Sequence, residues 1–368
     1  MIARAESGVP ITALRASAYR IPTDKPEADG TFAWGSTTLV LCEVEAGGET
    51  GLGFTYSETA NVDLIVGSFT RLLLGREAMA VGAATRALQA SVRNLGRDGI
   101  AATAISAVDL ALWDLKAKLL GLPLAILLGP LREAVPIYGS GGFTTYSDDE
   151  LRDQLSGWIH GDGCRFVKMK IGTDPDRDPH RMRVAKEAIG SAELFIDANG
   201  AFVPRQALAV AERAAEYGVA WFEEPVSGDD LEGLRRVRDN APTGMDIASG
   251  EYGYDLDYFR IMLGSGAVDV QQADATRCGG VTGFLAVAML CDAHHVPCSG
   301  HCAPSMHLHA ALAAPGLRHL EWFHDHVRIE QMVFDGAPSA RDGAIRPDLS
   351  RPGHGLVFKR QDAERYAV

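Results

Sequence analysis

The stretch Phe166-Val167-Lys168-Met169-Lys170-Ile171-Gly172 is a short apolar run that carries two lysines, Lys168 and Lys170, two residues apart. In a β-strand, residues i and i+2 point to the same face, so the run predicts a strand with both ammonium groups on one side, their Cα atoms about 6.6 Å apart. A strand normally buries at least one face. The rest of the sequence must therefore show what surrounds these two charges.

Similar short apolar runs recur between Val135 and Glu321, and helical segments separate them. The predicted strands are residues 136–138, 166–170, 194–197, 220–223, 246–248, 269–272, 296–299 and 319–321. Eight strand–helix units without a doubly wound pattern favour a parallel (β/α)₈-type barrel.

The first third of the chain has the pattern of an α+β domain. Antiparallel strands are predicted at residues 11–19, 37–45 and 51–55, and helices at residues 63–74 and 101–120. We therefore expect an α+β domain over residues 1–130 and a barrel over residues 131–334. The tail, from about residue 335 to residue 368, is expected to return to the first domain.

The composition limits the class of partner. The formal net charge of −13, without a Lys/Arg-rich block, argues against nucleic acid. The longest apolar run, residues 284–291, is far shorter than the roughly 18 residues of a membrane span. No signal peptide is evident at the N-terminus, so a cytoplasmic location is expected.

The 6 cysteines lie without paired spacing, which predicts reduced, buried thiols. Cys298-x-x-His301-Cys302 suggests zinc, but we disfavour this interpretation because no second Cys/His pair completes the usual set of ligands.

Charged or polar residues stand at the carboxyl ends of seven of the predicted strands, where the catalytic face of a parallel barrel lies. In chain order they are Lys168 and Lys170, Asp197 and Asn199, Glu223 and Glu224, Glu251, Asp274, His301, and Glu321. Asp197, Glu223 and Glu251 belong to consecutive strands and offer three hard oxygen ligands, which suit Mg²⁺. Each acid alone is better explained as a solvated strand end, but the set of three in consecutive strands favours a metal.

Two ammonium groups about 7 Å apart repel by roughly 2.4 kcal/mol at an effective dielectric constant near 20, which lowers the pKa of one of them by about 1.7. Lys170 could then act as a general base, whereas a lone Lys-x-Lys pair is also typical of an exposed strand face. Asp274 and His301 predict an acid/base dyad in which the carboxylate fixes the imidazole tautomer. His294, His295, His307 and His309 are interpreted as structural.

Taken in order, these residues resemble the enolase superfamily and, within it, the mandelate racemase subgroup. The resemblance spans nearly the whole chain and rests on Trp113-Asp114, Lys168-Met169-Lys170-Ile171-Gly172, Asp197-Ala198-Asn199, Glu223-Glu224-Pro225, Gly250-Glu251, Asp274 with Gly279-Gly280-Val281-Thr282-Gly283, Ser299-Gly300-His301, and Glu321. The muconate-lactonising branch instead usually has a lysine on the strand before Asp274 and lacks the histidine. The resemblance implies an α+β capping domain over a modified (β/α)₇β barrel, with the site between them.

The resemblance also implies roles for these residues. Asp197, Glu223 and Glu251 would bind Mg²⁺, which the substrate carboxylate chelates. Lys170 and His301 would flank the α-carbon, with Asp274 supporting the histidine. Lys168 would act electrostatically and Glu321 would hydrogen-bond the enediolate.

Such a site permits several reactions on a small carboxylate. We favour dehydration of an aldonate or aldarate to a 2-keto-3-deoxy acid; racemisation or epimerisation of a 2-hydroxy acid, and sugar-lactone cycloisomerisation, remain alternatives. A non-catalytic enolase-like protein is a further alternative. Members of the subgroup are often dimers or octamers, which implies a homo-oligomer.

Substrate specificity is expected from two capping segments, a loop at residues 23–34 and residues 53–58, which would close over the barrel mouth. Within and beside them, Lys25, Trp34 and Tyr56 are candidate substrate contacts, together with Asn199 at the barrel.

Overall fold

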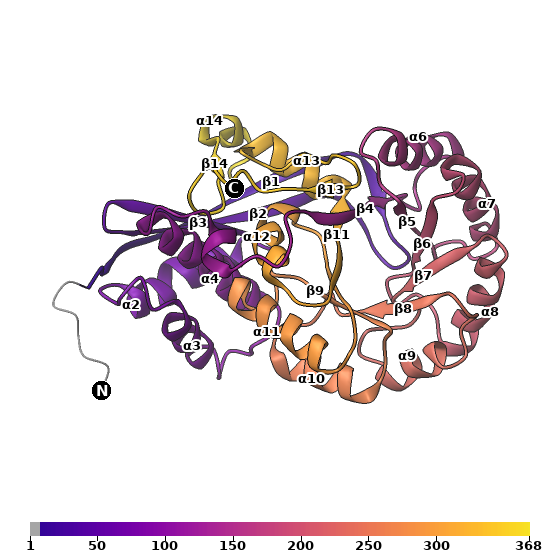
Figure 1. The fold of residues 1–368 in the computed structure, drawn as a ribbon, viewed down its shortest axis with the longest axis horizontal. Coiled ribbons are helices and arrows are strands. Elements are labelled where there is room, and N and C mark those ends of the chain that lie inside the picture. Colours follow the sequence, from indigo (N-terminus) through magenta and orange to yellow (C-terminus); the bar gives the residue numbers. More distant parts are fainter. Residues whose placement is uncertain (1–7) are drawn as a thin grey trace.

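A closed barrel of eight parallel strands forms the larger part of the computed structural model, which describes residues 8–368. Its strands are β4 (Val135–Gly141), β5 (Phe166–Lys170), β6 (Glu193–Asp197), β7 (Val219–Glu223), β8 (Asp246–Ser249), β9 (Val270–Ala273), β10 (Cys298–Gly300) and β11 (Leu317–Phe323). Each strand pairs with the next, and β11 pairs with β4 to close the ring (Figure 1). The predicted barrel is confirmed.

A helix follows every barrel strand. These helices are α6 (Asp148–His160), α7 (Asp178–Ile189), α8 (Pro204–Ala215), α9 (Leu231–Arg238), α10 (Leu256–Ser265), α11 (Gly280–Ala293), α12 (Pro304–Ala313) and α13 (His324–Val333). Helix α6 starts with a capping box between Ser147 and Glu150. The last helix, α13, contacts the capping strands through Asp325 and His326, which meet Thr37 and Tyr56.

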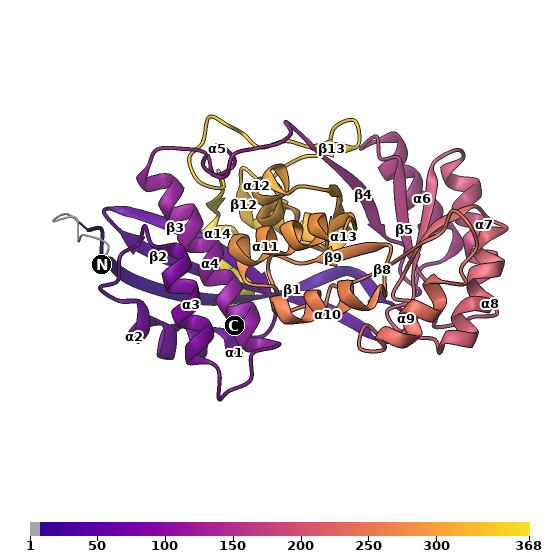
Figure 2. The same ribbon diagram turned by 60° about the horizontal axis from the view of Figure 1, so that its bottom comes forward.

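The first domain is the expected α+β unit. Its antiparallel sheet consists of β1 (Ile11–Ala28), β2 (Ala33–Ala46) and β3 (Glu49–Tyr56). Its helical elements are α1 (Ala60–Asp63), η1 (Leu64–Phe69), α2 (Thr70–Leu73), α3 (Val81–Ser91), α4 (Ile100–Leu119) and α5 (Leu124–Leu128). Helix α4 packs on β3 on one side and on α11 of the barrel on the other (Figure 2). The close approach to β3 requires Gly51, where a Cβ atom would lie 2.1 Å from the carbonyl oxygen of Ala111.

The segment over residues 23–34, predicted as a loop, is mainly a β-hairpin. Strand β1 continues to Ala28 and pairs with the start of β2, so that the hairpin runs from the capping domain to the barrel (Figure 1). The segment contains Pro22 and Pro26, which are tolerated because β1 is an edge strand. At the tip, a Cβ atom on Gly30 would lie 2.4 Å from the Ala198 carbonyl oxygen, so the hairpin abuts the barrel loops.

The C-terminal tail contacts both domains. Its elements are β12 (Phe334–Asp335), β13 (Ala344–Ile345), β14 (Val357–Phe358), α14 (Arg360–Ala363) and η2 (Glu364–Tyr366). Strand β13 pairs with β4 of the barrel, while the Val368 N–H donates a hydrogen bond to the Ala18 carbonyl of the cap. The domain limits at residues 130 and 334 remain our proposal.

The barrel interior below the mouth is filled by aromatic rings. Tyr138, Phe195 and Trp221 are fully buried and pack together, and the Lys168 ammonium group lies 5.4 Å from the centre of the Tyr138 ring. These rings lie beneath the lysines and carboxylates at the ends of the barrel strands. Between residues 8 and 368, no helix is long and apolar enough to cross a membrane.

Asp114 in α4 joins three parts of the fold, and we expect its replacement to destabilise the protein. Its carboxylate accepts hydrogen bonds from the backbone N–H groups of Leu52 and His354, both at 2.7 Å, and pairs with Lys118 at 2.6 Å. Because Asp114→Ala leaves buried donors without partners, the free energy of unfolding in urea should fall by about 3 kcal/mol. Asp149→Ala is the control, since this side chain is 92% exposed in its ion pair with Arg152. It should change stability by less than about 1 kcal/mol; equal effects would contradict this role for Asp114.

Candidate active site

A cavity of about 330 Å³ lies where the capping domain meets the carboxyl ends of the barrel strands. Barrel residues in its wall include Lys170, Asn199, Glu251, Arg277, His301 and Glu321. Capping residues include Arg20, Trp34, Thr37, Tyr56 and Glu58. The two predicted capping segments therefore both reach the barrel mouth.

Three carboxylates meet at the mouth, as the sequence predicts for a metal site. Asp197 and Glu223 end β6 and β7 and face each other across the strand pairing, and Glu251 follows β8. One oxygen from each lies within 4.8 Å of the others, and all three side chains are buried. Glu251 Oε2 has no hydrogen-bond partner among the described residues. Buried hard oxygens with an unpartnered acceptor fit a divalent cation such as Mg²⁺.

The two lysines point into this carboxylate cluster. Lys168 Nζ contacts Glu223 Oε1, and lies 2.8 Å from Glu321 Oε1 and 3.3 Å from Asp197 Oδ2. Lys170 Nζ lies 2.6 Å from Asp197 Oδ2 and 3.0 Å from Asn199 Oδ1. Both side chains are buried, so the exposed strand face considered from the sequence is wrong.

The predicted repulsion between the lysines is present, but it does not lower the pKa of Lys170 overall. Burial and the charge of Lys168 act to lower this pKa, but attraction to Asp197, Glu251 and Glu223 together outweighs them, and the pKa lies above its ordinary value. The pKa of Lys168 is raised as well, because Glu223 and Glu321 outweigh burial. A bound divalent cation shares the same carboxylate oxygens, so it would remove part of this stabilisation of the ammonium groups.

His301 and Asp274 form the expected dyad. His301 Nδ1 lies 2.8 Å from Asp274 Oδ2, and the other Asp274 oxygen accepts two hydrogen bonds of 2.7 Å from Thr276. Burial acts to raise the pKa of Asp274, but the bond to His301 and the charge of Arg277 hold it well below its usual range. His301 Nε2 therefore faces Glu251 and Glu321, and the nearest oxygens of these carboxylates lie 3.4 and 3.7 Å from it.

Two of the four histidines interpreted as structural have well-defined backbone partners. His307 accepts a hydrogen bond from the Ala275 N–H, and His309 accepts one from the Ala125 N–H. His294 and His295 are exposed.

Three of the four proposed substrate contacts lie at the cavity, and Lys25 does not. Trp34 donates a hydrogen bond of 2.8 Å to Glu27, and Tyr56 stacks on His326. Lys25 instead pairs with Glu150 at the start of α6, at 2.9 Å. Strand β1 has an irregular register between Pro22 and Glu27, which alters the direction of the side chains there.

Sequence reasoning missed Arg277, and it disfavoured Cys302 as a metal ligand. Arg277 donates to the Glu251 carbonyl at 3.0 Å and lies 3.5 Å from the carboxylates of Glu251 and Asp274. Arg277 lies three residues after Asp274 in the sequence, and this spacing could have identified it as a site residue. Cys302 follows His301 and has a left-handed φ of 52°, which no local pattern predicts.

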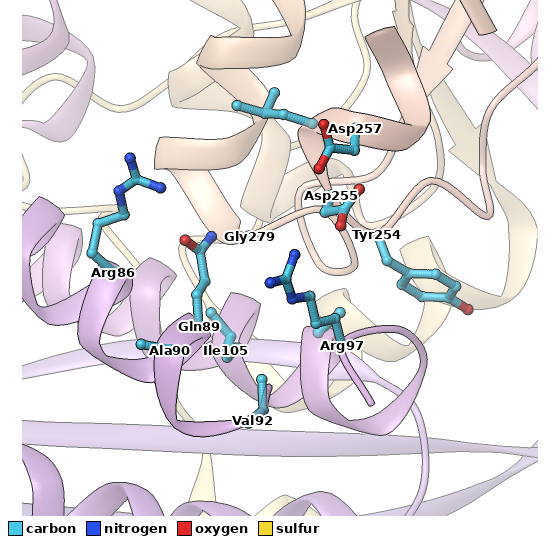
Figure 3. Close-up of a pocket in the computed structure, with 12 residues that line it drawn as sticks. Arg86, Gln89, Ala90, Val92, Arg97, Ile105, Tyr254, Asp255, Asp257 and Gly279 are labelled. Carbon is cyan, nitrogen blue, oxygen red and sulfur yellow. The ribbon is translucent and has the colours of Figure 1, made fainter. Parts of the chain in front are cut away.

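A second cavity, of about 470 Å³, lies away from this chemistry. It separates α3 of the cap from the start of α10, and Arg86, Gln89 and Arg97 on the cap face Asp255 and Asp257 (Figure 3). Asp255 already accepts the Tyr258 N–H as the cap of α10. This cavity lacks a lysine, a histidine and a carboxylate triad, so the first cavity is the candidate active site.

Comparison with known proteins agrees with this site. The chain is 33% identical to a 3,6-anhydro-α-L-galactonate cycloisomerase of Streptomyces coelicolor, over 97% of this chain and 99% of that protein. It is 32% identical to the L-talarate/galactarate dehydratase of Salmonella typhimurium, over 98% and 92%. The structure of that dehydratase with Mg and L-lyxarohydroxamate superposes with a TM-score of 0.90 at 28% identity, covering 100% of this chain and 95% of that chain.

A protein from Rubrobacter xylanophilus, described as mandelate racemase/muconate lactonizing enzyme-like, superposes with a TM-score of 0.95 at 48% identity, covering 98% of this chain and 100% of that chain. The family model of the mandelate racemase/muconate lactonizing enzyme N-terminal domain matches residues 20–129, and the enolase C-terminal domain-like model matches residues 150–363. The predicted magnesium cofactor agrees with the carboxylate cluster and with the Mg in the dehydratase structure. The chain belongs to the mandelate racemase/muconate lactonizing enzyme family of the enolase superfamily.

Proposed function

We propose that this protein binds Mg²⁺ and removes the α-proton of a sugar acid, and that it dehydrates this acid to a 2-keto-3-deoxy acid. One observation carries the proposal. Lys170 and His301, from strand ends that are not neighbours in the barrel, reach the same small cavity beside three buried carboxylates. One base beside a cation site can remove a proton α to a carboxylate, and the second group can give a proton to a departing hydroxyl.

Asp197, Glu223 and Glu251 would hold the Mg²⁺. When bound, the ion supplies positive charge that stabilises the negative charge developing on the substrate carboxylate. Lys168 supplies a fixed positive charge from the barrel floor, where Glu321 and Glu223 orient its ammonium group.

Lys170 and His301 move the protons. In dehydration, one of them takes the α-proton, and His301 as imidazolium gives a proton to the departing β-hydroxyl, so the C–H and C–O bonds break, a C=C bond forms and water leaves. The resulting enol takes a proton at the β-carbon and becomes the 2-keto-3-deoxy acid. Asp274 is the positioning residue for this step, because its bond to Nδ1 leaves Nε2 facing the cavity.

Two observations favour sugar acids as the substrate class. The wall offers polar side chains from the cap, among them Arg20, Thr37 and Glu58, which suit a polyhydroxylated chain. The relatives include dehydratases of galactarate, gluconate, galactonate and arabinonate. Cycloisomerisation is the second candidate, because the Streptomyces relative matched over almost its full length is a cycloisomerase.

A screen of mono- and diacid sugars with Mg²⁺ tests the reaction, and we expect a 2-keto-3-deoxy product. Lys170→Ala and His301→Asn should each lower kcat by about 10²- to 10⁴-fold, because each removes a proton-transfer group. Lys25→Ala is the matched lysine control and should leave kcat unchanged, since Lys25 pairs with Glu150 outside the cavity. α-Proton exchange with D₂O without loss of water would exclude dehydration and support epimerisation.

Magnesium should stabilise the folded protein, because it binds the native carboxylate cluster and not the unfolded chain. At a concentration 100 times its Kd, the free energy of unfolding should rise by about 2.7 kcal/mol. Thermal unfolding with Mg²⁺ and with EDTA measures this shift. Glu251→Gln should abolish it, whereas Glu224→Gln, which alters a buried carboxyl bonded to Ser249, should retain it. An identical shift in Glu251→Gln would refute the ligand assignment.

A further inference from the structure

A second group of metal-binding side chains lies beside the carboxylate triad. It consists of His301, Cys302 and Glu321, all buried, and shares no residue with the triad. Cys302 Sγ lies 3.3 Å from His301 Nε2 and 3.4 Å from Glu321 Oε2, and these last two atoms are 3.7 Å apart. The three donor atoms therefore form a nearly equilateral triangle.

This triangle has the dimensions of a tetrahedral zinc site. Zinc–ligand bonds of about 2.0 to 2.3 Å, at tetrahedral angles, place neighbouring ligand atoms roughly 3.3 to 3.7 Å apart. The three observed separations match this range. We infer that His301, Cys302 and Glu321 form a second, thiolate-containing metal site that takes Zn²⁺ and blocks the catalytic histidine.

The surroundings of the three ligands support this inference. Asp274 binds Nδ1 of His301 and leaves Nε2 toward the thiol, which is the carboxylate–histidine arrangement common around zinc. Glu321 Oε1 accepts a hydrogen bond of 2.6 Å from Ser140 Oγ and lies 2.8 Å from Lys168 Nζ, while Oε2 accepts the Cys302 backbone N–H at 3.1 Å and faces the thiol. The left-handed backbone at Cys302 places its thiol against both groups.

The chemistry separates this site from the triad. Thiolate and imidazole ligands favour Zn²⁺, whereas three carboxylates favour Mg²⁺. The zinc motif disfavoured in the sequence is thus revised: Cys298 does not take part, but Glu321 from the next strand supplies the third ligand. A fourth position remains for water.

The consequence for activity rests on the proposed function. Zinc on Nε2 would occupy the atom that His301 needs for proton transfer. Zinc should therefore inhibit turnover even when Mg²⁺ saturates the triad.

Cobalt(II) absorption tests the site without any substrate. A thiolate ligand produces a sulfur-to-cobalt charge-transfer band in the near ultraviolet, which Co²⁺ bound only to oxygen does not produce. With Mg²⁺ present in excess, we expect this band to saturate at one Co²⁺ per chain and to be bleached by Zn²⁺.

Cys302→Ser and Cys302→Ala should both lose the band while keeping the circular dichroism of the wild type. Cys298→Ser, at another buried thiol, should keep it. Absence of the band in the wild-type protein, or its persistence in either Cys302 variant, would overturn the site.

Inhibition is then measured during turnover of an acid sugar. Cys302→Ser should need about tenfold more Zn²⁺ than the wild type for half-inhibition, or more, because one ligand is lost. Equal sensitivity of the two proteins would overturn the inhibitory role. A cobalt band in a protein that turns over no acid sugar would refute the proposed function and leave the metal site standing.

Discussion

Charge balance at the barrel mouth is the constraint on which the rest of the site depends. Five carboxylates meet there (Asp197, Glu223, Glu251, Asp274 and Glu321), and three basic side chains face them (Lys168, Lys170 and Arg277). With both lysines protonated, five negative charges less three positive charges leave two, the charge that one Mg²⁺ neutralises. Without the ion, burial and the neighbouring Asp197 raise the pKa of Glu223 above its usual value.

The cap completes the site because the hairpin of β1 and β2 crosses from one domain to the other. Its tip lies so close to the Ala198 carbonyl that only glycine fits at Gly30. Trp34, in the same hairpin, is positioned by a hydrogen bond to Glu27. Burial, and then the charge of Asp325, raises the pKa of Glu27 to about 9, which keeps this carboxyl neutral near pH 7. In the proposed function, the barrel would supply the reacting groups, and the cap would supply the wall against which the substrate is selected.

Much of this architecture could be predicted from local patterns. The barrel strands and the charged residues at their ends follow from short apolar runs, and parallel strands bring those ends together whatever lies between them. The pKa of Lys170 could not be predicted, because it depends on how near Asp197 lies. Lys25 was misplaced because an irregular strand changes side-chain direction without a sequence signal. Cys302 was considered for zinc and disfavoured, because Glu321, the third donor beside it, comes from another strand.

A crystal structure with Mg²⁺ and a hydroxamate analogue of a sugar acid would test whether the three carboxylates hold the cation beside Lys170 and His301. We expect oxygens of Asp197, Glu223 and Glu251 at about 2.1 Å from the ion. We also expect that Lys170 leaves Asp197 and that Lys170 Nζ and His301 Nε2 both face the α-carbon of the analogue. An ion bound elsewhere, or a Lys170 that stays paired with Asp197 while His301 points away from the ligand, would contradict these roles.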